Sequence, residues 1–174
     1  MKLVRWKRFT WDLSKLPPLE NKLPAFFSFR EASREESKLV RGVVMTSFSL
    51  DSAWSDVLKI FRERLELQLD LAFQRESMPA IVVSHGVRII GASVISTESD
   101  CESNLLSGPC VLSEYCNRGL GTALLHQSLR HLCNVGLEHA SAITKEHVPS
   151  CKFVYPKFGS TVVAYDYEPQ VVGT

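Results

Sequence analysis

The sequence of 174 residues contains no continuous apolar run of the roughly 18 residues that a membrane-spanning helix needs. Its N-terminus also lacks the apolar segment that follows the basic residues of a secretory signal. We therefore predict a cytoplasmic protein without a membrane partner.

Paired cysteines and metal-binding spacings are also missing. The five cysteines form no CxxC pair, and their odd number argues against a complete set of intramolecular disulfides. The five histidines never occur at HxH or HExxH spacing. We therefore expect reduced thiols and no metal. The cysteines are Cys101, Cys110, Cys116, Cys133 and Cys151.

The chain has little net charge, with a formal value of +1, which provides no broad field for nucleic acid. Basic and aromatic residues do alternate near the N-terminus. They are Lys2, Arg5, Trp6, Lys7, Arg8, Phe9, Trp11 and Lys15. A nucleic-acid or membrane contact remains one interpretation, but the alternation favours a half-buried edge strand. Because prolines interrupt residues 1–25, we predict that they form an extension packed on a domain spanning 26–174.

Periodic apolar residues predict one α+β or α/β domain, with a mixed, mostly antiparallel sheet flanked by helices. Helices are expected after the capping-box spacing of Ser33 and Glu36, after Asp51, and from Gly119 to about Gly136. The Leu-rich segment 65–71 alternates as a strand would, but its helix-forming residues favour a helix. Strands are expected at 27–30, 80–83, 87–95, 105–112, 140–144 and 161–167, with a short irregular helix at 149–154.

The segment 113–121 joins the expected strand 105–112 directly to a helix. A helix that begins in such a turn leaves N–H groups unpaired at its positive end, where an anion is stabilised. Gly119 and Gly121 would let a phosphate approach the backbone, while Arg118 adds a cation and Thr122 a hydroxyl. The third glycine of a dinucleotide fingerprint and the Gly-Lys-Ser/Thr of a P-loop are both absent.

This turn resembles motif A of the GNAT acetyltransferase superfamily, Q/R-x-x-G-x-G/A. The matching residues are Cys116, Asn117, Arg118, Gly119, Leu120 and Gly121. Segment 87–94 is similar to the family's third strand, and 153–159 to its tyrosine segment. The resemblance covers roughly residues 26–167 in the family's order of elements. Cys116 departs from the usual Gln or Arg, and Ser160 stands where Phe is frequent.

The resemblance implies an N-acetyltransferase that transfers acetyl from acetyl-CoA to a primary amine by direct attack. It places the cofactor on the backbone of residues 116–122 and on the N–H groups of Val111 and Leu112, which would polarise the thioester. Tyr155 would be the general acid, because a phenol stays protonated at neutral pH. Glu102 is the candidate base, with Glu114, Glu146 or a water relay as alternatives. The acceptor would be a small-molecule or protein amine, and the protein a monomer or homodimer.

Two alternatives remain open. The same fold could serve as a catalytically silent CoA-binding module, since no base is certain. A cysteine acyltransferase would use Cys110 or Cys116 as nucleophile and His147 or His131 as base. No spacing pairs a thiol with a histidine, so this second alternative is disfavoured.

Overall fold

The computed structural model describes residues 4–20 and 22–166. Its strands are β1 (Trp6–Asp12), β2 (Phe27–Glu31), β3 (Ala80–His85), β4 (Arg88–Val94), β5 (Cys110–Val111), β6 (His139–Lys145) and β7 (Thr161–Tyr165). Its long helices are α1 (Ser37–Leu50), α2 (Leu58–Ala72) and α3 (Leu120–Asn134). The predicted helices and the expected α+β class are confirmed.

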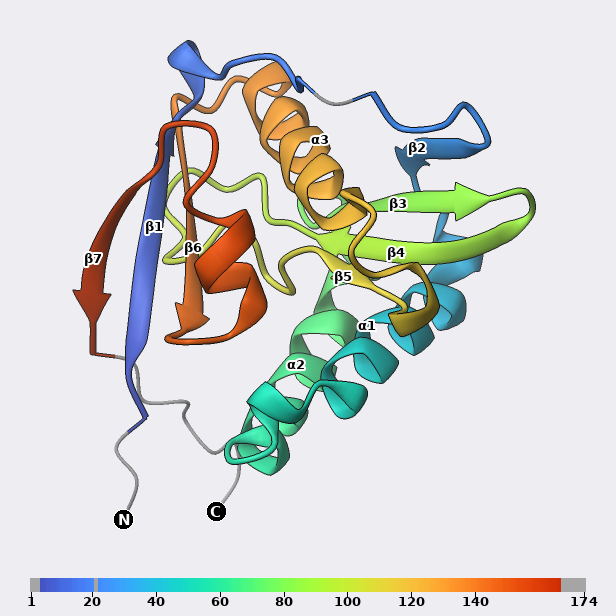
Figure 1. Cartoon of the computed structure of the whole chain (residues 1–174), viewed down its shortest axis with the longest axis horizontal. Coiled ribbons are helices and arrows are strands. Elements are labelled where there is room, and N and C mark those ends of the chain that lie inside the picture. The colour runs from blue at the N-terminus through green and yellow to red at the C-terminus, as the bar shows by residue number, and fades with distance from the viewer. Residues whose placement is uncertain (1–3, 21, 167–174) are drawn as a thin grey trace.

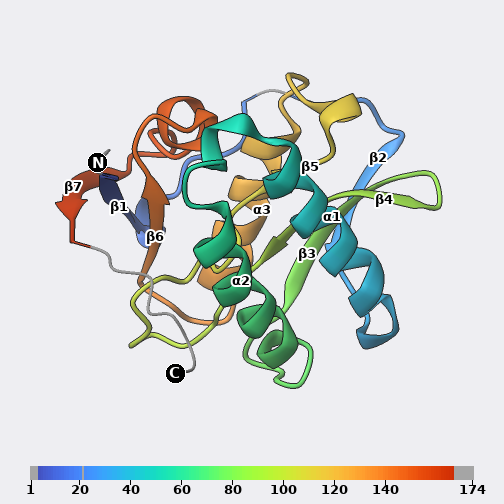
Figure 2. The same ribbon diagram turned by 90° about the horizontal axis from the view of Figure 1, so that it is seen from below.

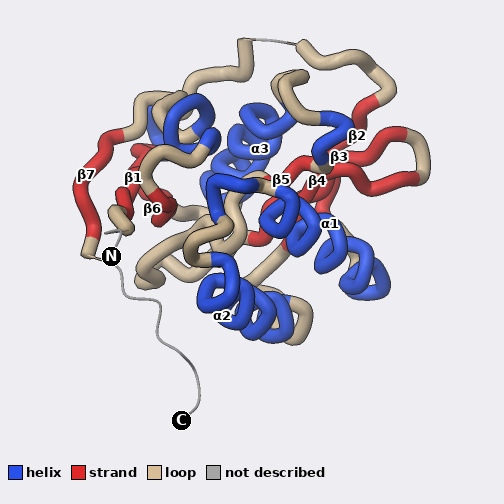
Figure 3. The backbone as a smooth tube through the Cα atoms, turned by 60° about the horizontal axis from the view of Figure 1, so that its bottom comes forward, coloured by secondary structure: helices blue, strands red, loops and turns tan. Residues whose placement is uncertain are grey.

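The strands form two antiparallel sheets, one in the order β6-β1-β7 and the other in the order β2-β3-β4-β5. Figure 3 shows the three-stranded sheet at one end of the molecule and the four-stranded sheet at the other. Helix α3 lies on one side of β3 and β4, while α1 and α2 lie on the other side (Figures 1 and 2). Because both faces are covered, β4 is buried from Ile89 to Val94.

The predicted hairpin 80–95 is confirmed, with β3 and β4 joined through Gly86 at φ +61. The predicted helix 65–71 lies within α2, where Leu65 and Leu69 face the core. The irregular helix expected at 149–154 is a π-helix, Ser150–Val154. The last expected strand ends at Tyr165, and its predicted end at residue 167 lies outside the described residues.

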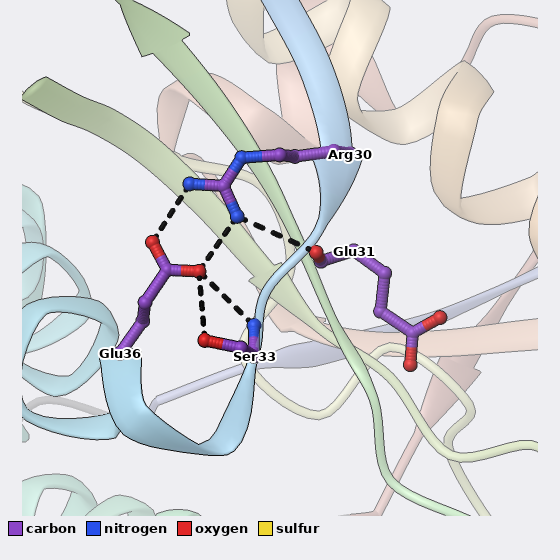
Figure 4. A network of polar contacts seen from close by, with 4 residues as sticks. All are labelled: Arg30, Glu31, Ser33 and Glu36. Carbon is purple, nitrogen blue, oxygen red and sulfur yellow. Dashed lines mark hydrogen bonds and ion pairs between the residues drawn. The ribbon is translucent and has the colours of Figure 1, made fainter. Parts of the chain in front are cut away.

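The expected start of α1 is confirmed by a polar network (Figure 4). The Glu36 carboxylate accepts hydrogen bonds from the Ser33 backbone N–H at 3.0 Å and from Arg30 at 2.6 and 2.7 Å. The bidentate Arg30 guanidinium and the Ser33 N–H lower the pKa of Glu36 to about 2. This network joins β2 to the short helical turn Arg34–Glu36 that precedes α1.

The edge-strand interpretation of the N-terminal segment is wrong. Strand β1 is the middle strand of its sheet, paired with β6 on one side and β7 on the other (Figure 1). Trp6, Phe9 and Trp11 all belong to the buried core, and Trp11 is completely covered. The alternation identified the strand, but two partners from the far end of the chain made it central. Residues 6–12 therefore contribute directly to the core.

The strand expected at 105–112 is confirmed only at its ends, since Leu105 forms an isolated bridge with Ile95 and Cys110–Val111 pairs as β5. The chain bulges before it, because Leu106 and Ser107 both donate their N–H groups to the Val94 carbonyl. Gly108 then adopts φ +65, and Pro109 has no N–H to contribute to a ladder. The bulge places residues 106–109 along a cleft instead of within the sheet.

Candidate active site

The glycine turn has the geometry of an anion-binding helix start. Asn117 (φ 63) and Gly119 (φ 81) are both left-handed, and they turn the chain into α3. The first hydrogen bond within the helix runs from the Ala123 N–H to the Gly119 carbonyl at 3.0 Å. The three preceding N–H groups therefore have no helical acceptor, and the helix dipole adds partial positive charge beside them. This arrangement favours an anion.

Sequence reasoning missed a second positive group at this turn, Lys157. Its Nζ donates to the Thr122 hydroxyl at 3.2 Å, which places an ammonium beside the first turn of α3. The Trp11 indole N–H holds the Lys157 carbonyl at 2.9 Å and so anchors this segment to β1. The only signal available was the position of Lys157 two residues after Tyr155, and no pattern linked it to a turn 35 residues away.

Arg118 does not reach the cleft that the turn lines. Its guanidinium donates to the Glu114 carbonyl at 3.3 Å and lies 5.4 Å from the centroid of the Tyr115 ring. The side chain is exposed and folds back on its own turn. In this conformation the positive charge near the helix start comes from Lys157 instead.

The two expected backbone donors, the N–H groups of Val111 in β5 and of Leu112 just after it, are not equivalent. The Leu112 N–H donates to the Ile90 carbonyl at 2.9 Å and is therefore occupied. Because Val111 faces Gly91 in the adjacent, non-hydrogen-bonded pair, its own N–H points away from β4. Strand β5 is the last strand of its sheet, so the Val111 N–H faces the open side.

A cleft of about 670 Å³ gathers the candidate residues. It runs from the start of α3, past β5 and the bulge, to the C-terminal end of α1 and one side of α2. All the candidate catalytic and cofactor-binding residues line it except Leu112 and Arg118. Those that do are Glu102, Val111, Cys116, Asn117, Gly119, Leu120, Gly121, Thr122 and Tyr155.

Tyr155 follows the π-helix and is 4% exposed. Its ring packs against Phe9 and Trp11, with centroid distances of 5.5 and 5.8 Å. Its hydroxyl lies against Gly108, where any Cβ would overlap it. Burial, with smaller contributions from the neighbouring thiols Cys110 and Cys151, raises the pKa of Tyr155 far above its usual value. The phenol therefore stays protonated at neutral pH.

Of the three glutamates considered as a base, only Glu102 lines the cleft. The Ser141 hydroxyl donates to its backbone carbonyl at 3.1 Å, which fixes the loop while the side chain stays exposed. Glu114 is paired with Arg88 at 3.1 Å, and Glu146 lies 3.7 Å from Lys7. A second carboxylate that the sequence reasoning missed, Asp51, also lines the cleft and caps the Ala53 N–H.

The geometry disfavours a cysteine nucleophile. Burial raises the pKa of Cys110 to about 12, and burial followed by the charge of Asp51 also raises that of Cys116. The Cys116 thiol points back to the Val111 and Leu112 carbonyls, at 3.7 and 3.6 Å. Neither histidine considered as a base lines the cleft. A thiol without a nearby base remains protonated and is a poor nucleophile.

Neither a metal-binding cluster nor a membrane-spanning helix occurs in the described part of the chain. Within the ranges 4–20 and 22–166, no group of three or more His, Cys, Asp or Glu side chains could hold a metal ion. Across the same residues, no helix is long and apolar enough to cross a membrane.

No protein-family model matches the chain, and no curated protein sequence matches it either. Solved structures do share its fold. A GCN5-related N-acetyltransferase from Sphaerobacter thermophilus superposes with a TM-score of 0.60 at 16% identity, covering 94% of this chain and 50% of that one. A Drosophila protein superposes with a TM-score of 0.61 at 14% identity, covering 93% of this chain and 50% of that one. The chain thus spans about half the length of these two structures.

A structure of similar length extends the comparison. The aminoglycoside N-acetyltransferase AAC(6')-Iy in complex with CoA superposes with a TM-score of 0.53 at 18% identity, covering 84% of this chain and 96% of that one. The chain therefore has the fold of the GCN5-related N-acetyltransferases, as its motifs predicted.

Proposed function

We propose that this protein is an N-acetyltransferase that transfers the acetyl group of acetyl-CoA to a primary amine. The observation that carries the proposal is the shared cleft, into which the start of α3, the open side of Val111 and Tyr155 all face. The shared fold supports it, since a protein of this fold has been solved with CoA bound. Each of the three groups corresponds to one requirement of acyl transfer.

The donor set at the start of α3 fits a pyrophosphate. Three N–H groups without helical acceptors and the Lys157 ammonium supply positive charge, and Gly119 and Gly121 present no side chain. The open edge of β5 fits an extended pantetheine arm lying beside it as an added strand. When bound, acetyl-CoA supplies an activated acetyl thioester, whose C–S bond breaks as the new C–N bond forms.

The remaining roles fall to individual groups of the chain. The Val111 N–H is the donor that would polarise the acyl oxygen, because the Leu112 N–H is already used by Ile90. Tyr155 holds a proton at Oη for the departing thiolate. The proton of the attacking amine passes to Glu102, directly or through water.

The test is release of free CoA thiol from acetyl-CoA across a panel of amines. We predict that Tyr155→Phe lowers kcat by about 100-fold or more, because a positioned general acid contributes that much. The affinity for CoA should be unchanged, since the hydroxyl and not the ring is removed. Tyr165→Phe is the matched control, because Tyr165 lies on β7 and does not line the cleft.

Two results would overturn parts of this proposal. If Tyr155→Phe turns over as fast as the wild type, the assignment of the acid is wrong. If the wild type binds CoA but acetylates none of the amines, a catalytically silent CoA-binding module of the same fold becomes the better description.

A further inference from the structure

Four aromatic rings form one wall of the cleft. They come from separate elements: Trp6 on β1, Phe48 on α1, Trp54 between α1 and α2, and Phe61 on α2. We call these four residues the aromatic wall. Trp54 lies at its centre, with ring centroids 4.7 Å from Phe61, 5.0 Å from Phe48 and 6.1 Å from Trp6.

The aromatic wall is ordered by its own packing. Trp6, Phe48 and Trp54 are each less than 10% exposed, whereas Phe61 is half-buried. Phe61 also stacks on Trp6 with a centroid distance of 6.3 Å, so every ring touches at least two others. The wall therefore offers a fixed apolar surface of stacked and tilted rings, which suits a planar group through edge or offset contacts.

The charge of the cleft is nearly balanced. The carboxylates that line it belong to Asp51 and Glu102, and the cations to Arg64 and Lys157. Asp51 already accepts the Ala53 N–H at 3.0 Å. A polyamine or a polycationic sugar would therefore find no excess of negative charge, whereas a single ammonium could approach Glu102.

We infer that the acceptor is a primary amine carried on an aromatic ring, such as an arylalkylamine. This inference rests on the proposed function and specifies its second substrate. The ring of the acceptor packs on the aromatic wall, and a short alkyl linker directs the nitrogen toward Glu102 and Gly108. Specificity comes from ring contacts that a linear or polyhydroxylated amine cannot make.

The experiment compares four probes: 2-phenylethylamine, n-butylamine, spermidine and kanamycin. Binding of each to the CoA complex is measured by calorimetry, and kcat/KM by release of free thiol from acetyl-CoA. We expect 2-phenylethylamine to exceed each of the others by about tenfold in kcat/KM. Spermidine, kanamycin or n-butylamine performing equally well or better would overturn the inference while leaving the acetyltransferase proposal intact.

A pair of matched variants assigns the preference to the wall. Phe61→Leu should raise the KM for 2-phenylethylamine about fivefold to tenfold without changing the KM for acetyl-CoA. Phe61→Tyr keeps the ring and should restore a value near that of the wild type. Phe26→Leu is the control, because Phe26 is 56% exposed and lies outside the cleft.

Failure of the two proposals can be distinguished. If no amine is acetylated although CoA binds, the proposed function is wrong, and the calorimetric comparison alone then decides the aromatic preference. If Phe61→Leu and Phe26→Leu change the KM for 2-phenylethylamine equally, the wall does not hold the acceptor. Circular dichroism melting of each variant shows that it is folded before its kinetics are compared.

Discussion

Gly121→Asp tests the anion site at the start of α3 most directly. Gly121 is the second residue of the helix, and its N–H is one of the three without a helical acceptor. A Cβ built at this position meets only Val154 Cγ2, at 3.9 Å, which is an ordinary van der Waals distance. The fold therefore accommodates a side chain here, and the consequence of the substitution is electrostatic.

The expected effects on stability and on binding have opposite signs. A carboxylate at the positive end of α3 should stabilise the free protein by about 0.5 kcal/mol through the helix dipole. The same carboxylate, about 4 Å from a phosphate charge at an effective dielectric constant of about 20, costs binding roughly 4 kcal/mol. That energy corresponds to about a thousandfold loss of CoA affinity.

The assay is thermal unfolding with and without CoA. A ligand at about 100 times its Kd stabilises the wild type by about 2.7 kcal/mol, which is a rise in Tm of roughly 5–10 °C for a chain of this size. Gly121→Asp should show no such rise while melting at or slightly above the temperature of the free wild type.

Gly121→Asn is the matched control, because it adds nearly the same volume without the charge. We expect it to keep most of the CoA-dependent rise in Tm. If Gly121→Asp retains the full rise, the phosphates do not lie at this helix start. If Gly121→Asn abolishes the rise as completely as Gly121→Asp, steric exclusion and not charge explains the loss.

Two further predictions concern backbone geometry and pH. Gly108→Ala would force a Cβ onto the Tyr155 hydroxyl at a left-handed residue, so kcat should fall about as far as in Tyr155→Phe; an unchanged kcat in the thiol assay would contradict the placement of the hydroxyl. Glu36→Gln should cost about 1 kcal/mol of unfolding free energy at pH 7, measured by urea unfolding. Because the pKa of Glu36 is lowered from 4.5 to about 2, its contribution is complete above pH 4.5 and is lost as the pH falls toward 2. A difference between wild type and Glu36→Gln that stays constant down to pH 2 would refute this linkage.

The elements that the sequence predicted correctly depend on interactions between residues close together in the chain. The start of α1 depends on Ser33 and Glu36, three residues apart, and the β3–β4 hairpin on the residues around Gly86. These patterns are local, so the sequence displays them directly. The glycine turn is local as well, and its left-handed Gly119 leads into α3 as predicted.

The predictions that failed concern strands whose pairing is set by other segments of the chain. The central position of β1 depends on β6 and β7, which follow it by more than 120 residues. The short β5 depends on a bulge in which Leu106 and Ser107 share the Val94 carbonyl. Neither effect leaves a pattern in the sequence of β1 or β5 itself, because a strand has the same alternation at an edge as at the centre.

The sequence by itself therefore determined most of the elements and the phosphate-like turn, since each depends on residues close together in the chain, and the order of three such motifs indicated the acetyltransferase fold. Only the tertiary structure decided that the Val111 N–H is free while the Leu112 N–H is not. It also placed Lys157 at the start of α3 and assembled the aromatic wall from four elements. Sites built from contacts between distant segments become visible only when packing brings those segments together.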